Sequence, residues 1–264
     1  MSAPLLQLDA ATIQFGGLTA VSAFTTAVAD NELVGLIGPN GAGKTTAFNL
    51  ITGVYQPTSG SIRFAGQPTV GLKPNQLTRL GIARTFQNIR LFHSMSVFDN
   101  IRAATQLHRR HGILDALWRG RAHRAGEREV EARVMELLEI FSLDKQRGEL
   151  AKSLPYGDQR RLEIVRALAT KPRLLLLDEP AAGMNPTEKD DLMRLIRFVK
   201  DRYQIAVLLV EHDMKVVMGI CERIAVLEYG RKIAEGSPQE IQRHPQVIEA
   251  YLGAAASGKE SPDA

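Results

Sequence analysis

The chain has 264 residues, of which 44% are hydrophobic, so it is long enough for a sizeable core and for one or two domains. No apolar run approaches the roughly 18 residues of a membrane helix, and a formal net charge of +4 does not by itself indicate a nucleic-acid binder. The single cysteine, Cys221, permits no internal disulfide and indicates packing in a reducing compartment. The N-terminus lacks a basic leader, so we expect no signal peptide.

The first part of the chain alternates between short β-type segments and turns. Gly16-Gly17 and Asp30-Asn31 are turn pairs, and residues 57–60 form another turn with Pro, Ser and Gly. The expected strands are Leu5–Leu8, Thr12–Phe15, Phe24–Val28 and Ser61–Phe64.

Residues Gly38 to Thr46 read Gly-Pro-Asn-Gly-Ala-Gly-Lys-Thr-Thr, which contains the phosphate-loop pattern Gly-x-x-x-x-Gly-Lys-Thr. The apolar run Leu33–Ile37 before it predicts a buried strand, and Thr45–Thr52 after it predicts a helix that Gly53 ends. Glycines let backbone N–H groups curl around a polyphosphate, and the helix N-terminus adds partial positive charge. The alternative is a chance glycine turn, and the flanking segments favour the phosphate loop. The expected nucleotide-binding residues are Gly38, Pro39, Asn40, Gly41, Ala42, Gly43, Lys44, Thr45 and Thr46.

From about residue 90 to residue 158 the pattern is helical. Val97–Leu107 can form a helix, and the apolar residues of Glu127–Phe141 share one helical face. The α/β alternation then returns, with a helix at Glu188–Lys200 and strands at Leu174–Leu177, Ala206–Val210 and Arg223–Leu227. Residues 254–264 are expected to be disordered. The chain therefore indicates one nucleotide-binding α/β unit interrupted by a helical subdomain.

Two carboxylates follow the apolar run that ends at Leu177. Asp178 can organise a Mg²⁺ shell through water, and Glu179 can polarise an attacking water molecule. A solvated loop is the alternative for this pair taken alone, and the earlier phosphate loop favours the catalytic interpretation. Gln87 and His212 each follow an expected strand, where a single polar residue is more typical of a surface position.

The order of these features resembles the ATP-binding cassette family over nearly the whole chain. The matching features are the phosphate loop, Gln87, Leu154–Arg161 at the start of a helix, Asp178-Glu179, Asn185 and His212. The resemblance implies an α/β P-loop NTPase fold, with a RecA-like mixed sheet, an N-terminal antiparallel β-subdomain and an inserted α-helical subdomain. It implies one ATPase domain at 1–253, with a catalytic core at about 1–89 and 160–253, a helical subdomain at about 90–159, and the disordered tail 254–264.

The same resemblance implies roles for individual residues. The catalytic group would be Glu179, which orients the attacking water with His212, together with Gln87 and Lys44. Mg²⁺ would be held by Thr45, by Gln87 and, through water, by Asp178. Phe15 matches the aromatic position that stacks on adenine, with Val21 packed nearby, although Phe15 could equally be a sheet residue.

The family signature Leu-Ser-Gly-Gly-Gln is altered to Leu-Pro155-Tyr156-Gly157-Asp158. Pro155 removes the serine hydroxyl that contacts the γ-phosphate bound to the second subunit, while Gly157 and the helix N-terminus keep N–H groups for it. Tyr156 can supply a hydroxyl whose direction the sequence leaves open. The next loop contains Ala182, Gly183 and Asn185, and its asparagine stands where an aspartate is more usual, which leaves the hydrogen bonding across the dimer open.

Residues 156–164, 178–186 and 211–218 are similar to ATPases of high-affinity branched-chain amino-acid importers. This implies ATP and Mg²⁺ as cofactors, a second ATPase subunit, integral-membrane permease subunits and, indirectly, a periplasmic solute-binding protein. It implies no nucleic-acid partner, and a peripheral place on the cytoplasmic face of the inner membrane. The alternatives are the ATPase of a urea or amide importer or of a lipopolysaccharide exporter, a soluble cassette ATPase acting on nucleic acid or ribosomes, and a small-molecule kinase.

Two further segments have two interpretations each. Asn88, Arg90, Leu91 and Phe92 would line a groove for the permease, or Leu91 and Phe92 would belong to the core. The arginine-rich insert, residues 109–124, is either a solvated face or a surface for anionic lipid headgroups.

Overall fold

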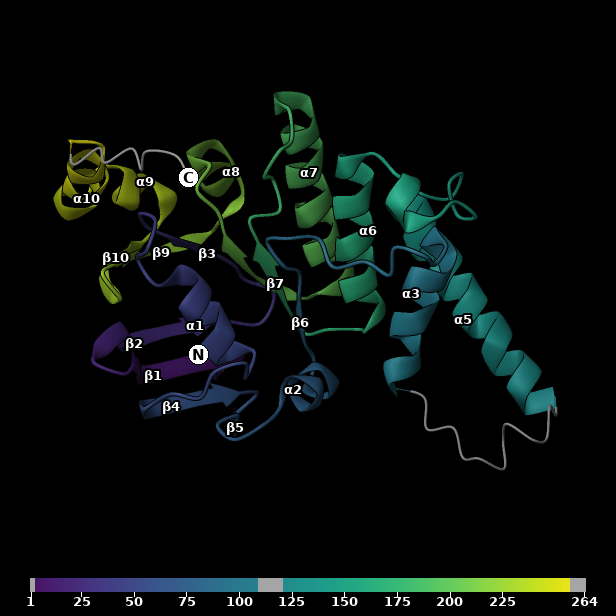
Figure 1. Ribbon diagram of the computed structural model, residues 1–264, viewed down its shortest axis with the longest axis horizontal. Helices are drawn as coiled ribbons and strands as arrows, with labels where there is room; N and C mark the ends of the chain where they lie inside the picture. Colours follow the sequence, from purple (N-terminus) through teal and green to yellow (C-terminus); the bar gives the residue numbers. More distant parts are fainter. Residues whose placement is uncertain (1–2, 109–120, 257–264) are drawn as a thin grey trace.

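The computed structural model describes residues 3–108 and 121–256 and contains two sheets (Figure 1). The larger sheet has six strands in the order β10-β9-β3-β8-β7-β6, and the smaller sheet has four strands in the order β2-β1-β4-β5. Figure 1 shows α6 and α7 on one side of the larger sheet, with α3 and α5 beyond α6, and the smaller sheet on the other side with α1 close to it. The architecture is therefore layered around the larger sheet.

The larger sheet is parallel except at one edge. Its strands are β3 (Leu33–Ile37), β6 (Ile82–Arg84), β7 (Leu174–Asp178), β8 (Ala206–Val210), β9 (Arg223–Glu228) and β10 (Arg231–Gly236). β3 pairs in parallel with both β8 and β9, and β8 continues through β7 to β6. β10 pairs with β9 in the antiparallel sense and forms the edge. All residues of β3, β7 and β8 are buried, as expected for strands covered on both faces.

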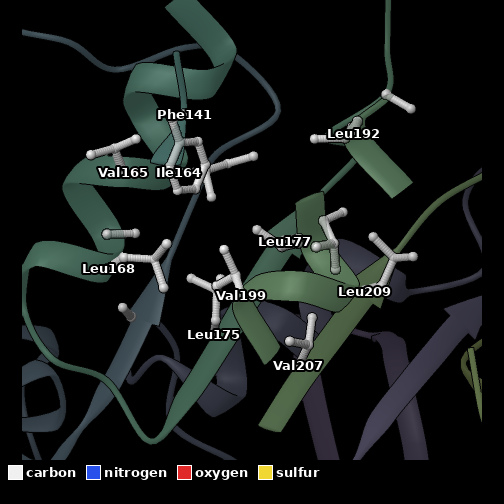
Figure 2. Packing of buried hydrophobic residues seen from close by; sticks show 14 of the residues in the cluster. Phe141, Ile164, Val165, Leu168, Leu175, Leu177, Leu192, Val199, Val207 and Leu209 are labelled. Carbon is white, nitrogen blue, oxygen red and sulfur yellow. The ribbon is translucent and has the colours of Figure 1, made fainter. Parts of the chain in front are cut away.

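Alternate residues of these strands enter two different hydrophobic cores. Leu175 and Leu177 of β7 face the core that contains α6 and α7, and Leu174 and Leu176 face the core shared with α1 and the smaller sheet. Figure 2 shows Leu175 and Leu177 beside Val207 and Leu209 of β8 and close to Val199. Because side chains along a strand point to opposite faces in turn, each five-residue strand joins both cores.

The helical layer contains α3 (Val97–Thr105), α5 (Arg121–Ile140), α6 (Tyr156–Ala169) and α7 (Pro186–Tyr203). α3 packs against both α5 and α6. The predicted apolar face of α5 is buried, although the helix begins at Arg121 rather than at Glu127. Ser96 caps α3 by accepting a hydrogen bond from the Asp99 N–H at 3.0 Å, so the predicted start of this helix at Val97 is correct.

The smaller sheet differs from the prediction in several respects: β2 and β4 begin earlier than expected, at Leu18 and Ser59, and β5 was not predicted. The two strands expected at Leu5–Leu8 and Thr12–Phe15 form the single strand β1 (Leu6–Phe15), which has a bulge where Ala10 has a φ of 45°. A bulge absorbs the extra residue and lets pairing continue on both sides of it. The other strands are β2 (Leu18–Val28), β4 (Ser59–Phe64) and β5 (Gln67–Pro68), and α1 (Lys44–Ile51) packs into the same core.

Several short helices were not predicted from the sequence. They are α2 (Pro74–Leu80), α8 (Met214–Ile220), α9 (Pro238–Gln242) and α10 (Pro245–Ala256). Residues 254–256 continue α10, so the expected disordered tail begins too early, and residues 257–264 lie outside the described part of the chain. None of the helices within 3–108 and 121–256 combines the length and the apolar character that crossing a bilayer requires.

Candidate functional site

The loop between β3 and α1 is shaped from outside by two neighbouring segments. Gly43 has a φ of 100°, and an added Cβ there would lie 2.7 Å from the carbonyl oxygen of Ala20 in β2. At Gly38 an added Cβ would overlap the carbonyl oxygen of Leu227 at the end of β9. The Gly230 N–H, in the turn after β9, donates to the Ala42 carbonyl at 2.9 Å. The phosphate-loop conformation therefore depends on close backbone packing that side chains would prevent.

Lys44 begins α1 and bends back over the loop. Its ammonium Nζ donates to the carbonyl oxygens of Gly38 at 2.7 Å and Pro39 at 2.9 Å. Burial lowers the pKa of this ammonium, and the nearby charges of Glu179 and Asp178 act in the opposite direction. The structure thus holds a buried cation at the centre of the loop, where a polyphosphate would gain a strong charge-assisted contact.

A cavity of about 600 Å³ lies over the loop. It collects polar side chains from separate elements, since Lys44 comes from α1, Gln87 follows β6 and Glu179 follows β7. The lining residues are Leu18, Thr19, Ala20, Asn40, Gly41, Ala42, Gly43, Lys44, Thr45, Thr46, Gln87, Glu179 and Tyr229. The loop residues expected to bind nucleotide, apart from Gly38 and Pro39, therefore share one cavity with Gln87 and Glu179. Three of the four expected catalytic residues, counting Lys44 of the loop, line it.

The two residues expected near adenine are not among this lining. Phe15 is half-exposed and its ring meets the edge of Tyr55, with 5.0 Å between the ring centroids. Val21 is fully buried in the core of the smaller sheet. The lining instead contains the exposed side chains of Leu18 and Tyr229, which the sequence analysis did not select. Both stand in or next to β-turns, where composition alone does not separate a ligand contact from an ordinary turn.

The expected catalytic carboxylate meets two polar partners. Glu179 Oε2 accepts a hydrogen bond from Gln87 Nε2 at 3.2 Å, and it lies 3.7 Å from His212 Nδ1. Glu179 has a φ of 47°, and its N–H donates to the Val210 carbonyl at 2.8 Å. A left-handed backbone at a residue other than glycine is strained and is often found at functional positions. The structure brings together three residues that are 125 positions apart at the extremes in the chain.

Asp178, the last residue of β7, has a partner that the sequence analysis missed. Its Oδ2 lies 2.7 Å from the guanidinium Nη2 of Arg84, and both side chains are almost fully buried. Arg84 Nη1 also donates to Asn49 Oδ1 at 2.6 Å. Arg84 is the last residue of β6, and the parallel pairing of β6 with β7 sets it beside the carboxyl end of β7. The Arg84–Asp178 ion pair can be recognised only once β6 and β7 are known to be neighbours, and the sequence alone does not give the strand order.

Glu211 is a second functional candidate that the sequence analysis did not select. It directly follows β8 (Ala206–Val210), is fully buried, and accepts hydrogen bonds from the N–H groups of Ala181 at 2.8 Å and His212 at 3.1 Å. Burial raises the pKa of this carboxyl, while the backbone donors act against the rise. Glu211 therefore ties the loop after β7 to the loop that carries His212. A charged residue at the end of an apolar strand was the signal available in the sequence.

The residues expected to hold Mg²⁺ carry the oxygen donors that this ion prefers. Thr45, next to Lys44 in the chain, and Gln87 both line the cavity, and Asp178 stands at the end of β7 directly before Glu179. Across residues 3–108 and 121–256 there is no group of three or more His, Cys, Asp or Glu placed to hold a metal alone. The hydroxyl, amide and carboxylate oxygens of Thr45, Gln87 and Asp178 are ligand types that Mg²⁺ accepts, and proteins usually bind this ion with one or two side chains together with substrate phosphates and water.

The altered signature lies at the start of α6. Pro155 occupies the N-cap position, where its missing N–H costs little. The Tyr156 hydroxyl accepts a hydrogen bond from Arg160 Nη2 at 3.2 Å, so it points toward the chain's own interior. Asp158 accepts a hydrogen bond from Gln146 Nε2 at 3.1 Å. The sequence left open where the Tyr156 hydroxyl points, and in the structure it contacts Arg160 of the same chain.

The loop after β7 uses its unusual asparagine locally. Asn185 Oδ1 accepts a hydrogen bond from the Glu188 N–H at 3.0 Å and the Glu188 carboxylate accepts one from the Asn185 N–H at 2.9 Å. This reciprocal arrangement is a capping box at the start of α7. Gly183 has a φ of 73° and lies against the ring of Tyr156. Ala182 lies in the same loop, so the signature turn and this loop adjoin within one chain.

The four residues expected to line a permease groove differ in exposure. Leu91 is 7% exposed and packs in the helical core, so its interpretation as a groove contact is wrong. Phe92 is 50% exposed and lines a cavity of about 380 Å³ with Phe86. Asn88 and Arg90 are exposed and lie between Phe86 and Phe92 in the sequence, but they do not line the cavity. Residues 109–120 of the arginine-rich insert lie outside the described part of the chain.

Comparison with known proteins places this geometry in a family. A family model described as ABC transporter matches residues 21–182, which contain the phosphate loop, the signature and both carboxylates. The chain belongs to the ABC transporter family. As an ABC ATPase it binds ATP and couples its hydrolysis to transport, and it has the P-loop ABC ATPase fold.

Named relatives cover almost the whole chain. The high-affinity branched-chain amino acid transport ATP-binding protein BraF of Pseudomonas aeruginosa is 46% identical over 97% of this chain and 100% of its own length. The lipopolysaccharide export system ATP-binding protein LptB of Escherichia coli is 35% identical over 90% of this chain and 93% of its own. A second family model, branched-chain amino acid ATP-binding cassette transporter, matches residues 231–257.

A solved structure agrees with the fold. The ADP conformation of MJ1267, an ATP-binding cassette of an ABC transporter, has a TM-score of 0.82 and 28% identity to this chain. The match covers 96% of this chain and 100% of the other. The mixed sheet and the helical layer described above are therefore those of ABC ATPases, as the sequence predicted.

Proposed function

We propose that this chain is the ATP-hydrolysing subunit of an importer for branched-chain or related amino acids. The observation that carries the proposal is the single cavity formed by the phosphate loop, Gln87 and Glu179, in a chain 46% identical to BraF. The match of residues 231–257 to the branched-chain amino acid model favours an importer over a lipopolysaccharide exporter, since this segment lies outside the general cassette match.

In this proposal the triphosphate lies along the phosphate loop. Lys44 exchanges the carbonyl oxygens of Gly38 and Pro39 for oxygens of the β- and γ-phosphates, which are stronger partners for an ammonium. The Thr45 hydroxyl, Gln87 and, through water, Asp178 would hold Mg²⁺. This ion would supply positive charge that offsets the negative charge on the phosphates.

Glu179 acts as the general base. A water molecule beside its carboxylate attacks the γ-phosphorus, the bond from that phosphorus to the β–γ bridging oxygen breaks, and the water proton passes to Glu179. Gln87 at 3.2 Å and His212 at 3.7 Å fix the orientation of the carboxylate and of the water. The strained backbone of Glu179 and the buried anchor Glu211 keep these loops in register.

A second ATPase subunit completes each site. The lining of the described nucleotide cavity contains no residue of the signature turn Pro155–Asp158, so within the described residues this turn is available to a partner's nucleotide. ATP joins the two subunits head to tail and favours the closed dimer only by its difference in affinity between the open and closed states. The 380 Å³ cavity beside Phe86 and Phe92 receives a permease segment at the cytoplasmic face of the inner membrane, where the chain is a peripheral subunit.

Two substitutions test the catalytic assignment. Glu179→Gln should keep ATP binding, reduce turnover by about 10²–10⁴-fold, and stabilise an ATP-bound dimer that is measurable by size-exclusion chromatography. Lys44→Ala should lose ATP binding itself. Glu131→Gln, at an exposed position of α5, is the matched control and should keep parental binding and turnover. Hydrolysis at the parental rate by the Glu179→Gln variant would rule out Glu179 as the base.

The solute is tested in the assembled transporter. In proteoliposomes with the permease subunits and solute-binding protein, ATP-dependent uptake of leucine, isoleucine or valine is expected, and uptake of urea is not. Uptake of urea alone would contradict the proposed solute class. Ribosomes or DNA that stay bound to the purified chain at high salt would favour the non-transport alternative.

A further inference from the structure

A buried ion pair on α6 has no role in the proposed mechanism. Arg160 and Glu163 are one helical turn apart, their side chains are 0% and 1% exposed, and Arg160 Nη1 lies 2.8 Å from Glu163 Oε2. Removing two charges from water is costly unless further hydrogen bonds satisfy the remaining donors and acceptors. The partners of this pair therefore indicate what the pair is for.

Apart from the Tyr156 hydroxyl on the same helix, the partners are backbone groups of one short segment, residues 86–90. Arg160 donates from Nη1 to the Phe86 carbonyl at 2.6 Å and from Nη2 to the Gln87 carbonyl at 2.7 Å. Glu163 Oε1 accepts from the N–H groups of Phe86 at 3.3 Å and Arg90 at 3.2 Å. Four backbone groups on either side of the Gln87 side chain are thus bonded to α6.

The residue immediately before this segment is bonded to the sheet instead. The Thr85 N–H donates to the Leu176 carbonyl at 2.9 Å, and the Thr85 hydroxyl accepts from the Asp178 N–H at 3.2 Å. Both partners belong to β7. The attachment of the chain therefore changes from the sheet to α6 across the single peptide bond between Thr85 and Phe86.

We propose that the Arg160–Glu163 pair makes residues 86–90 move as one body with α6, about a hinge at the Thr85–Phe86 peptide. Gln87 then travels with α6, while its partner Glu179 stays with β7, and the 3.2 Å contact between them changes whenever α6 turns. α6 begins with the signature turn, which in the proposed dimer meets the nucleotide of the other subunit. Arg160 and Glu163 are thus positioning residues that link the two nucleotide sites, an inference that rests on the proposed function.

The test removes the pair and asks whether Gln87 still acts. The variant Arg160→Met/Glu163→Gln should lower kcat for ATP by about 10–100-fold with an unchanged KM, because binding does not use these residues. Gln87→Ala should lower kcat in the parental background but change it less than about twofold in the pair-less background. Multiplicative effects would overturn the proposal, because a pair that acts only on stability would leave the contribution of Gln87 intact.

Arg133→Met/Glu136→Gln is the matched control. This pair has the same spacing, lies on α5 at 2.9 Å, and contacts Tyr203 rather than residues 86–90. It should leave kcat unchanged, and the full effect of Gln87→Ala should persist in it. If Arg160→Met/Glu163→Gln fails to fold, Arg160→Lys keeps a cation beside Glu163 but loses the guanidinium fork that bonds both the Phe86 and the Gln87 carbonyls, and a smaller effect of Gln87→Ala is expected.

Hydrogen exchange gives a measurement independent of turnover. Three proteins are compared, all carrying Glu179→Gln: one with no further change, one with Arg133→Met/Glu136→Gln and one with Arg160→Met/Glu163→Gln. ATP should slow amide exchange of residues 86–90 in the first two but not in the third. Equal slowing in all three would overturn the link. If the Glu179→Gln chain instead fails to bind ATP or to dimerise, the proposed function itself is wrong, so the two failures are distinguishable.

Discussion

Replacing Arg84 by methionine should cost this protein several kcal/mol of folding stability. Arg84 and Asp178 form an ion pair of 2.7 Å with side chains 8% and 3% exposed, so the substitution leaves a buried carboxylate without its cation. Removing one partner of a buried pair typically costs about 3–5 kcal/mol. For a chain of this size about 1 kcal/mol lowers the melting temperature by roughly 2–4 °C, so a decrease of about 6–20 °C is expected.

The assay is urea unfolding followed by circular dichroism, at constant pH and without nucleotide. Arg173→Met is the matched control, because Arg173 pairs with Asp30 at 3.0 Å while both side chains are more than half exposed. An exposed pair contributes about 0–1 kcal/mol, so this variant should remain close to the parent. Adding Asp178→Asn to Arg84→Met should recover part of the loss, since no charge then stays buried. A loss below about 1 kcal/mol for Arg84→Met would refute this reasoning.

Three further predictions concern single residues. Gly43→Ala should weaken ATP binding, measured by calorimetry, by at least about tenfold, because the added Cβ would lie 2.7 Å from the Ala20 carbonyl oxygen. The control is Gly66→Ala, where nothing lies within 4 Å of the added Cβ, and it should leave ATP binding unchanged. Burial raises the pKa of the Cys221 thiol to about 12, so a thiol reagent at pH 8 should label it only after unfolding, and fast labelling of the native chain would contradict its burial. Burial raises the pKa of Glu211 above 4.5, so the folded state binds this proton more readily than the unfolded state, and stability falls as pH rises above that value. Glu211→Gln removes this dependence. The difference in the free energy of unfolding between variant and parent, measured by urea titration, should therefore change as pH rises above 4.5, and a difference independent of pH would contradict the raised pKa.

The parts of the fold that could be predicted from the sequence are those set by local patterns. The strand Leu174–Leu177 was found to within one residue, because a strand buried on both faces is a continuous apolar run. The start of α3 at Val97 was predicted correctly from the helical pattern of the residues, which is local. The structure adds the cap by Ser96, which the sequence analysis did not use. The bulge at Ala10 was missed and split β1 in two, because a bulge depends on the partner strand rather than on the residues of β1.

The same distinction applies to the candidate site. Lys44, Asp178 and Glu179 follow a local pattern of loop or strand end and could be selected from the sequence. Arg84 could not, because its partner Asp178 comes from a neighbouring strand. Glu211 also follows an apolar strand, but the backbone donors that define its role come together only in the folded chain. Leu91 was misassigned for a related reason, since one apolar residue of an irregular segment turns inward while the next, Phe92, turns outward.

The alternation of β7 between two cores makes the strand intolerant of changes in length. Deleting one residue between Leu174 and Leu177 would exchange the faces of the residues that follow and send side chains shaped for one core into the other. Asp178 and Glu179 would be shifted by the same step, away from Arg84 and Gln87. Substitutions within this strand can be absorbed by repacking, whereas insertions and deletions cannot, so homologous proteins should vary the composition of this segment but keep its number of residues.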